Sequence, residues 1–261
     1  MSSRVRVTLV QFRHTGGEFL ENLHLFKEAI LRHRGSDLIV FPESTLHRHS
    51  LTHETPTRIR TVLRGLPPED LASIESFIAD AGARVVYGNL VEREGRLYNV
   101  ATYTDGHTRV DYEKTHVHWT EPFAPGTRFP VVETPLGPTG FVICYDAAFP
   151  EVPRLLALQG ARAIVNISAI PDHFPLKYVH RRLVACSIEN QVFTLFANRT
   201  GLGFSGGSAV VDPRGEIIAL ADDEQPHLTV EIDMSEVDAW RTEEPLFPHR
   251  RPDIYTDILR T

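Results

Sequence analysis

One cysteine, Cys144, stands at the junction between a short apolar run and a segment with helical periodicity. Residues 141–143 form the run, and apolar residues recur at helical spacing after Pro150. This profile is typical of a strand that turns sharply into a helix. A cysteine on such a turn could act as a nucleophile, and the backbone N–H of Tyr145 could bind an oxyanion. Because free cysteine is among the most buried residue types, a structural role for Cys144 is the alternative.

Two charged residues occupy the same place relative to other predicted strands. Glu43 follows the apolar segment 37–41, and Lys114 follows the segment 108–112. Groups at the carboxyl ends of strands converge when the strands are neighbours in one sheet. Converged with Cys144, Glu43 could take the thiol proton, and Lys114 could favour the thiolate and the tetrahedral oxyanion. Taken singly, each of these charges is more often simply solvated.

The segments that must position these residues alternate between strand and helix patterns. Strands are predicted at 5–12, 37–41, 85–91, 97–104, 108–112, 131–132, 141–143, 163–167, 191–197, 208–212, 216–220 and 228–232. Helices with one apolar face are predicted at 18–34, 68–81, 150–159 and 176–190. The two halves share this plan, which predicts one α/β domain over 1–261 with two stacked mixed sheets and helices outside both. The polar, proline-rich tail 243–261 is expected to lie on another surface.

Composition excludes several classes of protein. The 261 residues are 42% hydrophobic and 23% charged, which is enough to bury a large core. The net charge of −7 argues against a nucleic-acid binder, which needs a basic face. The two cysteines form no disulfide framework, and no apolar run reaches the roughly 18 residues of a membrane span. A cytoplasmic protein without a signal peptide, a nucleic-acid partner or a membrane partner is therefore expected.

Four sequence words around the candidate residues resemble the nitrilase superfamily of carbon–nitrogen hydrolases. They are FPES at 41–44, YEKTH at 112–116, VICYDAAFPE at 142–151 and SIENQVFTLFANRTG at 187–201. The resemblance covers nearly the whole chain, and it implies a four-layer αββα sandwich of two mixed β-sheets flanked by helices. It also implies a Glu–Lys–Cys triad at Glu43, Lys114 and Cys144, with no cofactor and no metal. It further implies homodimers or higher homo-oligomers, in which the tail 243–261 reaches over the partner.

The resemblance also bears on the substrate. A second glutamate that helps to position substrate is common in the superfamily, and Glu121 is the matching residue. Tyr145-Asp146 after the cysteine resembles the amidase-type branches. Members of the ω-amidase type commonly carry an arginine where Ala148 stands, and alanine cannot clamp a substrate carboxylate as arginine does. The expected substrate is therefore a small neutral or cationic amide, or a carbamoyl compound, hydrolysed through a thioester acyl-enzyme.

Other functions remain open at this point. The same thioester could transfer its acyl group to an amine, and an ω-amidase-like or nitrile-hydrolysing specificity is possible. A catalytically silent binding protein of the same fold is the alternative from another class, and the intact Glu43, Lys114 and Cys144 argue against it.

Loops beside the three candidates could line one pocket. The residues concerned are His116, Trp119, Phe149, Ser168 and His173. Solvated loop histidines and core aromatics are the competing interpretation. The histidine spacing does not indicate the ligand geometry of a metal site. Cys186, at a buried-looking helix position, is expected to pack without taking part in chemistry.

Overall fold

The computed structural model describes residues 4–13, 19–47, 55–65, 68–222 and 224–255. In the first half the elements are β1 (Arg4–Val10), α1 (Phe19–His33), β2 (Leu38–Val40), α2 (Pro56–Gly65), α3 (Pro68–Ala81), β3 (Val85–Arg93), β4 (Arg96–Thr104) and β5 (Arg109–Glu113). In the second half they are β6 (Val131–Thr134), β7 (Gly137–Ile143), the 3-10 helix η1 (Cys144–Ala148), α4 (Glu151–Leu158), β8 (Ala163–Ser168), α5 (Leu176–Asn190), β9 (Phe193–Asn198), β10 (Thr200–Gly201), β11 (Phe204–Ser205), β12 (Ala209–Val211), β13 (Ile217–Leu220), β14 (His227–Asp233), α6 (Ser235–Glu243), η2 (Phe247–His249) and η3 (Pro252–Ile254).

The strands form two six-stranded sheets of related topology. The first sheet has the order β14-β1-β2-β3-β4-β5, and the second has the order β13-β12-β9-β8-β7-β6. In each, the three central strands are parallel and the flanking strands pair in antiparallel fashion. Both sheets are therefore mixed, as the sequence predicts.

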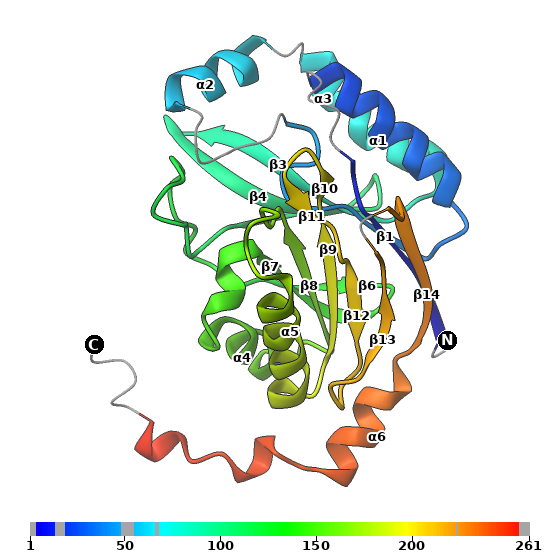
Figure 1. The fold of residues 1–261 in the computed structure, drawn as a ribbon, viewed down its shortest axis with the longest axis vertical. Coiled ribbons are helices and arrows are strands. Elements are labelled where there is room, and N and C mark those ends of the chain that lie inside the picture. Colours follow the sequence, from blue (N-terminus) through cyan, green and yellow to red (C-terminus); the bar gives the residue numbers. More distant parts are fainter. Residues whose placement is uncertain (1–3, 14–18, 48–54, 66–67, 223, 256–261) are drawn as a thin grey trace.

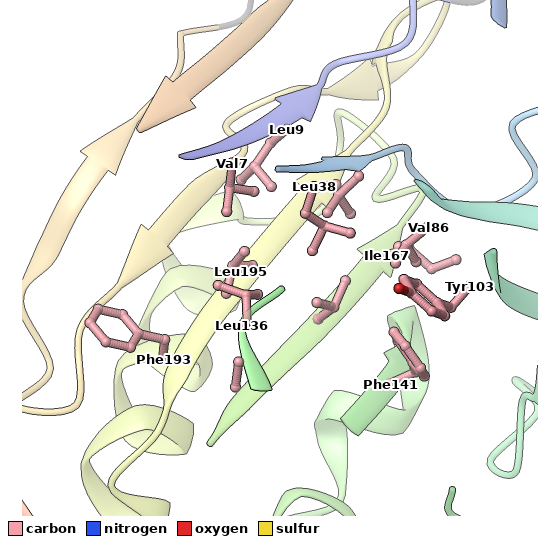
Figure 2. Packing of buried hydrophobic residues seen from close by; sticks show 14 of the residues in the cluster. Val7, Leu9, Leu38, Val86, Tyr103, Leu136, Phe141, Ile167, Phe193 and Leu195 are labelled. Carbon is pink, nitrogen blue, oxygen red and sulfur yellow. The ribbon is translucent and has the colours of Figure 1, made fainter. Parts of the chain in front are cut away.

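The two sheets pack face to face, and their inner faces form the main core. Figure 2 shows Val7, Leu38 and Val86 of the first sheet facing side chains of the second sheet. The register follows the two-residue period of a strand: Phe141 and Ile143 point into this core, whereas the intervening Val142 points to the opposite face.

Helices cover the outer face of each sheet. Helices α1 and α3 pack on the first sheet through a cluster that includes Phe26, Ile30 and Ile78, while α4 and α5 pack on the second (Figure 1). The molecule is thus the predicted four-layer αββα sandwich. Because both faces of β2 are buried, this strand appears in the sequence as a continuous apolar run, whereas β1 begins with alternating exposed arginines and buried valines.

Two helices and one short ribbon were not predicted from the apolar pattern. Helix α2 packs Ile59 and Leu63 over the β3–β4 hairpin, and α6 buries Val237. Both helices are short, with ten and nine residues, and mostly polar, so they offer few apolar positions from which a helical period can be recognised. The strands β10 and β11 form a two-residue ribbon within the predicted loop after β9.

Two further observations concern the helices and the carboxyl-terminal tail. Within the described part of the chain, no helix has the length and apolar character needed to cross a membrane. The tail 243–261 can be followed to Tyr255, and 256–261 lie outside the described residues. The guanidinium carbons of Arg154 and Arg241 of the same chain lie 5.5 and 5.2 Å from the ring centroid of Phe247 in this tail.

Candidate active site

Glu43 lies on a tight turn directly after β2, and its side chain is only 2% exposed. The neighbouring strand must approach this turn closely, and Gly88 makes this possible. A Cβ atom at residue 88 would lie 2.2 Å from the backbone nitrogen of Ser44 and 2.6 Å from the carbonyl oxygen of Pro42. Ser44 itself has a positive φ of 53°. The turn that presents Glu43 therefore depends on a glycine in the adjacent strand.

Lys114 follows β5 and is fully buried. Its backbone N–H donates to the carbonyl oxygen of Asn99 on β4 at 2.9 Å, which extends the ladder by one residue. Its Nζ atom donates to Glu43 Oε1 at 3.1 Å and to Glu121 Oε1 and Oε2 at 2.8 and 3.0 Å. One buried ammonium group thus holds two buried carboxylates.

The charges of this cluster shift each other's proton affinities. Burial alone would lower the pKa of Lys114, but the negative charge of Glu43, with that of Glu121, outweighs it and raises the pKa. Burial raises the pKa of Glu121, and the repulsion from Glu43 adds to this effect while Lys114 opposes it. Lys114 is therefore a permanent cation at neutral pH.

Cys144 is the first residue of η1, immediately after β7. Its φ is +48°, a left-handed conformation that a residue with a side chain rarely adopts. Burial raises the pKa of the thiol well above its usual range, and the charge of Glu43 raises it further. Lys114 and a backbone hydrogen bond from Ala169 act in the opposite direction. At neutral pH the resting group is a thiol with a carboxylate and an ammonium group as its electrostatic neighbours.

The three residues come together across two sheets. Glu43 and Lys114 follow β2 and β5 of the first sheet, with β3 and β4 between them, and Cys144 follows β7 of the second sheet. The prediction that they converge because their strands are neighbours in one sheet is wrong. They meet because the two sheets stack, which brings the carboxyl end of β7 against the same end of β2 and β5.

Two buried polar residues beside Glu43 were missed in the sequence. The amide of Asn99 donates to Glu43 Oε1 at 2.7 Å, and Asn99 is fully buried. Arg199, 1% exposed, follows β9 at the same end of the sandwich, where burial lowers its pKa to about 10 and the charge of Glu43 opposes this. A polar residue inside an apolar strand was the available signal for Asn99. Arg199 donates to the carbonyl oxygen of His47 at 3.4 Å, and this contact with a distant turn cannot be predicted from the local sequence.

His47 is buried on the turn that carries Glu43, and its burial makes the stability of the protein depend on pH. We expect the free energy of unfolding to fall by up to about 3 kcal/mol through His47 as the pH drops from about 6.5 to about 4. Burial, with a smaller contribution from Arg199, lowers the pKa of His47 from 6.5 to about 4. Between these values the unfolded chain binds the proton and the folded chain does not, so this stability is present above about pH 6.5 and is lost toward pH 4.

Urea unfolding across this pH range, on the wild-type protein and a His47→Asn variant, measures the effect. His33, whose pKa burial also lowers to about 4, contributes in both proteins, so the difference isolates His47. Equal pH slopes in the two proteins would contradict the prediction.

The predicted pocket residues fall into two groups. One group forms a row of rings beside the nucleophile: His116 stacks on Phe149 at 4.0 Å, Phe149 meets Tyr145 at 5.2 Å, and Tyr145 meets Trp119 at 5.8 Å, all between ring centroids. The indole of Trp119 is 79% exposed. His118, another histidine of the same loop, stacks on Trp119 at 3.7 Å between ring centroids.

The other two residues, Ser168 and His173, make contacts of a different kind. Ser168 is buried, and its hydroxyl donates to Asn166 of its own strand at 3.0 Å. The side chain of His173 is 83% exposed and lies 3.9 Å from Asp172. These contacts join neither residue to the charged cluster.

A groove separate from the candidate catalytic residues is present, and the described residues form no metal site. A groove of about 620 Å³ lies beside β5, lined by Arg93, Arg109, Val110, Asp111, Glu113, Arg128, Phe129 and Pro130. Arg93 in this groove pairs with Asp111 and Glu113, and none of the candidate catalytic residues lines it. Among the described residues, no group of three or more His, Cys, Asp or Glu side chains could hold a metal ion.

Known proteins resemble this chain over most of its length. The family model of carbon-nitrogen hydrolases matches residues 6–242. An (R)-stereoselective amidase from a Pseudomonas species is 31% identical over 257 residues, which is 95% of this chain and 92% of that protein. An omega-amidase from Saccharomyces cerevisiae is 25% identical over 287 residues, covering 99% of this chain and 97% of that protein.

The fold agrees with solved structures of the same kind. The crystal structure of a carbon-nitrogen hydrolase from Helicobacter pylori superposes with a TM-score of 0.87 at 23% identity, and the match covers 99% of both chains. The sandwich of two mixed sheets is thus a nitrilase-superfamily fold. With the family match over most of its length and a relative at 31% identity, the chain belongs to the carbon-nitrogen hydrolase family and is an amidase-like enzyme of the nitrilase superfamily.

Proposed function

We propose that this enzyme hydrolyses the carbon–nitrogen bond of a small amide or carbamoyl compound through a thioester on Cys144. One observation carries the proposal. The buried Lys114 ammonium joins Glu43 and Glu121, and all three charges act on the thiol of Cys144. A general base, a fixed cation and a nucleophile are the groups that a cofactor-independent acyl transfer needs.

The first step forms the carbon–sulfur bond. Because burial raises the pKa of Cys144, the thiol loses its proton to Glu43 as its sulfur attacks the substrate carbonyl carbon. Among the described residues, Asn99 and Lys114 both donate to Oε1 of Glu43, so we assign the proton to Oε2. The charge of Lys114 and the N–H of Tyr145 stabilise the oxyanion. As the second residue of η1, Tyr145 precedes the first hydrogen bond within that helix.

The next steps break the carbon–nitrogen bond and regenerate the thiol. Glu43 returns its proton to the leaving nitrogen, ammonia or an amine departs, and the acyl group remains on Cys144 as a thioester. Glu43 then takes a proton from water as the water oxygen attacks the thioester carbonyl. The carbon–sulfur bond breaks, the acid leaves, and the sulfur recovers the proton from Glu43.

Glu121 has a different role in this scheme. It accepts hydrogen bonds from Lys114 with both of its carboxylate oxygens and so anchors the ammonium group. Glu43 contributes only one oxygen to Lys114, which leaves it available as the base. Glu121 therefore acts on substrate through the orientation of Lys114.

The substrate is proposed to be neutral or cationic. Ala148 on η1 offers no group that binds a carboxylate. The row of rings from His116 to Trp119 presents aromatic surface beside the nucleophile. The relatives named as an (R)-stereoselective amidase and an omega-amidase support the amide class.

The deciding experiment measures ammonia release from a panel of amides, dicarboxylic monoamides, carbamoyl amines and nitriles, with a Cys144→Ala protein as the blank. A slow substrate should add its acyl mass to the peptide that contains Cys144, and the peptide that contains Cys186 serves as the internal control. Cys186 is half-buried like Cys144, and removal from solvent raises its pKa to about 11. No hydrolysis above the blank across the panel, or label on Cys186 alone, would refute the proposal.

Replacement of Asn99 by leucine tests the orientation of the base. We expect kcat to fall by about 10- to 100-fold, because a hydrogen bond to a charged group contributes about 1.5–3 kcal/mol. KM should change little, since Asn99 binds Glu43 and not substrate. Steady-state kinetics gives both constants. Thr102→Val, which removes a hydrogen bond to Asp111 from the same strand, is the control that should keep full activity. Equal kinetics in the two variants would contradict the assignment.

We also propose a cytoplasmic homo-oligomer with a single domain per chain, whose tail 243–261 reaches a partner. Leu155, Leu158 and Ile188 are 42–46% exposed on α4 and α5, an apolar surface that a second copy would cover. Both cysteines are free, which suits a reducing compartment. Light scattering on the purified protein tests the assembly, and a monomer at micromolar concentration would refute it.

A further inference from the structure

The carboxylate of Asp146 lies at the junction between the two sheets and is fully buried. It is the third residue of η1, two residues after Cys144. Its Oδ2 accepts hydrogen bonds from the hydroxyl of Tyr112 at 2.8 Å and from the N–H of Ile143 at 3.1 Å. A buried charge of this kind is stable only where several donors surround it.

The other oxygen is bonded as fully. Oδ1 accepts from the Thr115 hydroxyl at 2.9 Å and from the His116 N–H at 2.7 Å, and the His116 Nδ1 lies at 3.2 Å. The charge of Asp146 also helps burial to raise the pKa of Tyr112. One carboxylate therefore accepts hydrogen bonds from β5, from the loop that begins after Lys114 and from the last residue of β7.

Asp146 and its partners lie on both sides of Lys114 and of Cys144 in the sequence. Tyr112 precedes Lys114 by two residues, and Thr115 follows it directly. Ile143 precedes Cys144, and Asp146 itself lies two residues beyond it. The carboxylate thus ties the backbone on both sides of the lysine to the backbone on both sides of the cysteine.

The link matters because, among the described residues, the hydrogen bonds of the Lys114 ammonium do not reach the second sheet. The hydrogen bonds of the Lys114 ammonium go to Glu43 and Glu121, which belong to the first sheet and its loop. Cys144 belongs to the second sheet. A shift of about 1 Å between reacting groups can reduce a rate by roughly 10²-fold.

We propose that Asp146 is a positioning residue that sets the separation between Cys144 and Lys114 across the two sheets. It acts through Tyr112, Thr115 and the backbone, and it does not touch substrate. The inference rests on the proposed function, since it concerns the rate of the same acyl transfer.

Asp146→Asn tests the role with little change in size. An amide presents two N–H donors where the carboxylate accepts, so it cannot satisfy all five contacts. We expect kcat per folded molecule to fall by about 10²-fold, with KM within about threefold of wild type. Tyr112→Phe and Thr115→Val each remove one donor, and each should lower kcat by about 3- to 10-fold. The Asp146→Asn/Thr115→Val double variant should be little worse than Asp146→Asn alone, because both changes break the same link.

Asp212→Asn is the matched control. Asp212 is 8% exposed and accepts the backbone N–H groups of Arg214 and Glu216 at 2.9 Å in the turn between β12 and β13. The Asp212→Asn variant should be less stable than the wild-type protein and should keep the wild-type kcat. Folded fractions from thermal denaturation normalise all rates.

The outcomes separate the two proposals. If the wild-type enzyme hydrolyses the panel and Asp146→Asn keeps its kcat per folded molecule, the positioning role is refuted and the proposed function stands. If Asp146→Asn does not fold, unchanged kcat in both Tyr112→Phe and Thr115→Val refutes it equally. If the wild-type enzyme shows no hydrolysis above the Cys144→Ala blank, the proposed function itself fails.

Discussion

Replacement of Cys144 by alanine is expected to reduce kcat for amide hydrolysis by about 10⁴- to 10⁶-fold, because removal of a catalytic nucleophile in comparable enzymes has effects of this size. The thioester cannot form without the sulfur. Glu43 and Lys114 remain in place, so weak binding of substrate should persist. Ammonia release at saturating substrate, followed over hours, measures the residual rate.

The fold of this variant should be preserved. Cys144 adopts a positive φ, and alanine bears the same strain because both residues carry a Cβ. We expect the free energy of unfolding to stay within about 1 kcal/mol of wild type. Cys186→Ala is the matched control: its sulfur accepts a hydrogen bond from Thr194 at 3.5 Å inside the α5–β9 packing, so this variant should lose some stability and keep its activity. Turnover by Cys144→Ala well above the blank would disprove the thioester route.

Replacement of Lys114 by methionine should have the second largest effect, because it alters stability and catalysis together. The change leaves Glu43 and Glu121 facing each other in a buried site without their shared cation. Loss of one partner from a buried ion pair typically costs about 3–5 kcal/mol. We therefore expect urea unfolding to show a loss of this size, and activity to fall by at least about 10³-fold through the lost oxyanion contact.

A second substitution separates the two effects. Lys114→Met combined with Glu121→Gln removes one of the two repelling charges, so it should recover part of the stability. It should recover none of the activity, since the oxyanion still lacks a cation. Wild-type stability in the single variant would show that the ion cluster is not coupled to folding. Activity regained by the double variant would remove Lys114 from the mechanism.

The residues at the ends of strands are the part of this site that can be predicted from the sequence. Strands β2 and β7 lie between other strands with both faces covered, so each appears as an uninterrupted apolar run that ends abruptly at a polar residue. Glu43 and Cys144 could therefore be identified as strand-end residues. Lys114 follows the largely polar edge strand β5, so its place was predicted from the run of adjacent strands that ends there. The sequence alone thus determined the layer architecture and the three candidate residues.

The tertiary structure decided how these residues meet. No local pattern assigns β5 and β7 to different sheets, because sheet membership depends on the pairing of strands distant in the chain. Asn99 reaches Glu43 across 56 residues of sequence, and Asp146 reaches Tyr112 across 34. The Asn99 contact forms once β2, β3 and β4 pair in the first sheet. The Asp146 contact forms only once the two inner faces pack together, since the burial of their apolar side chains brings the ends of β5 and β7 within hydrogen-bond distance.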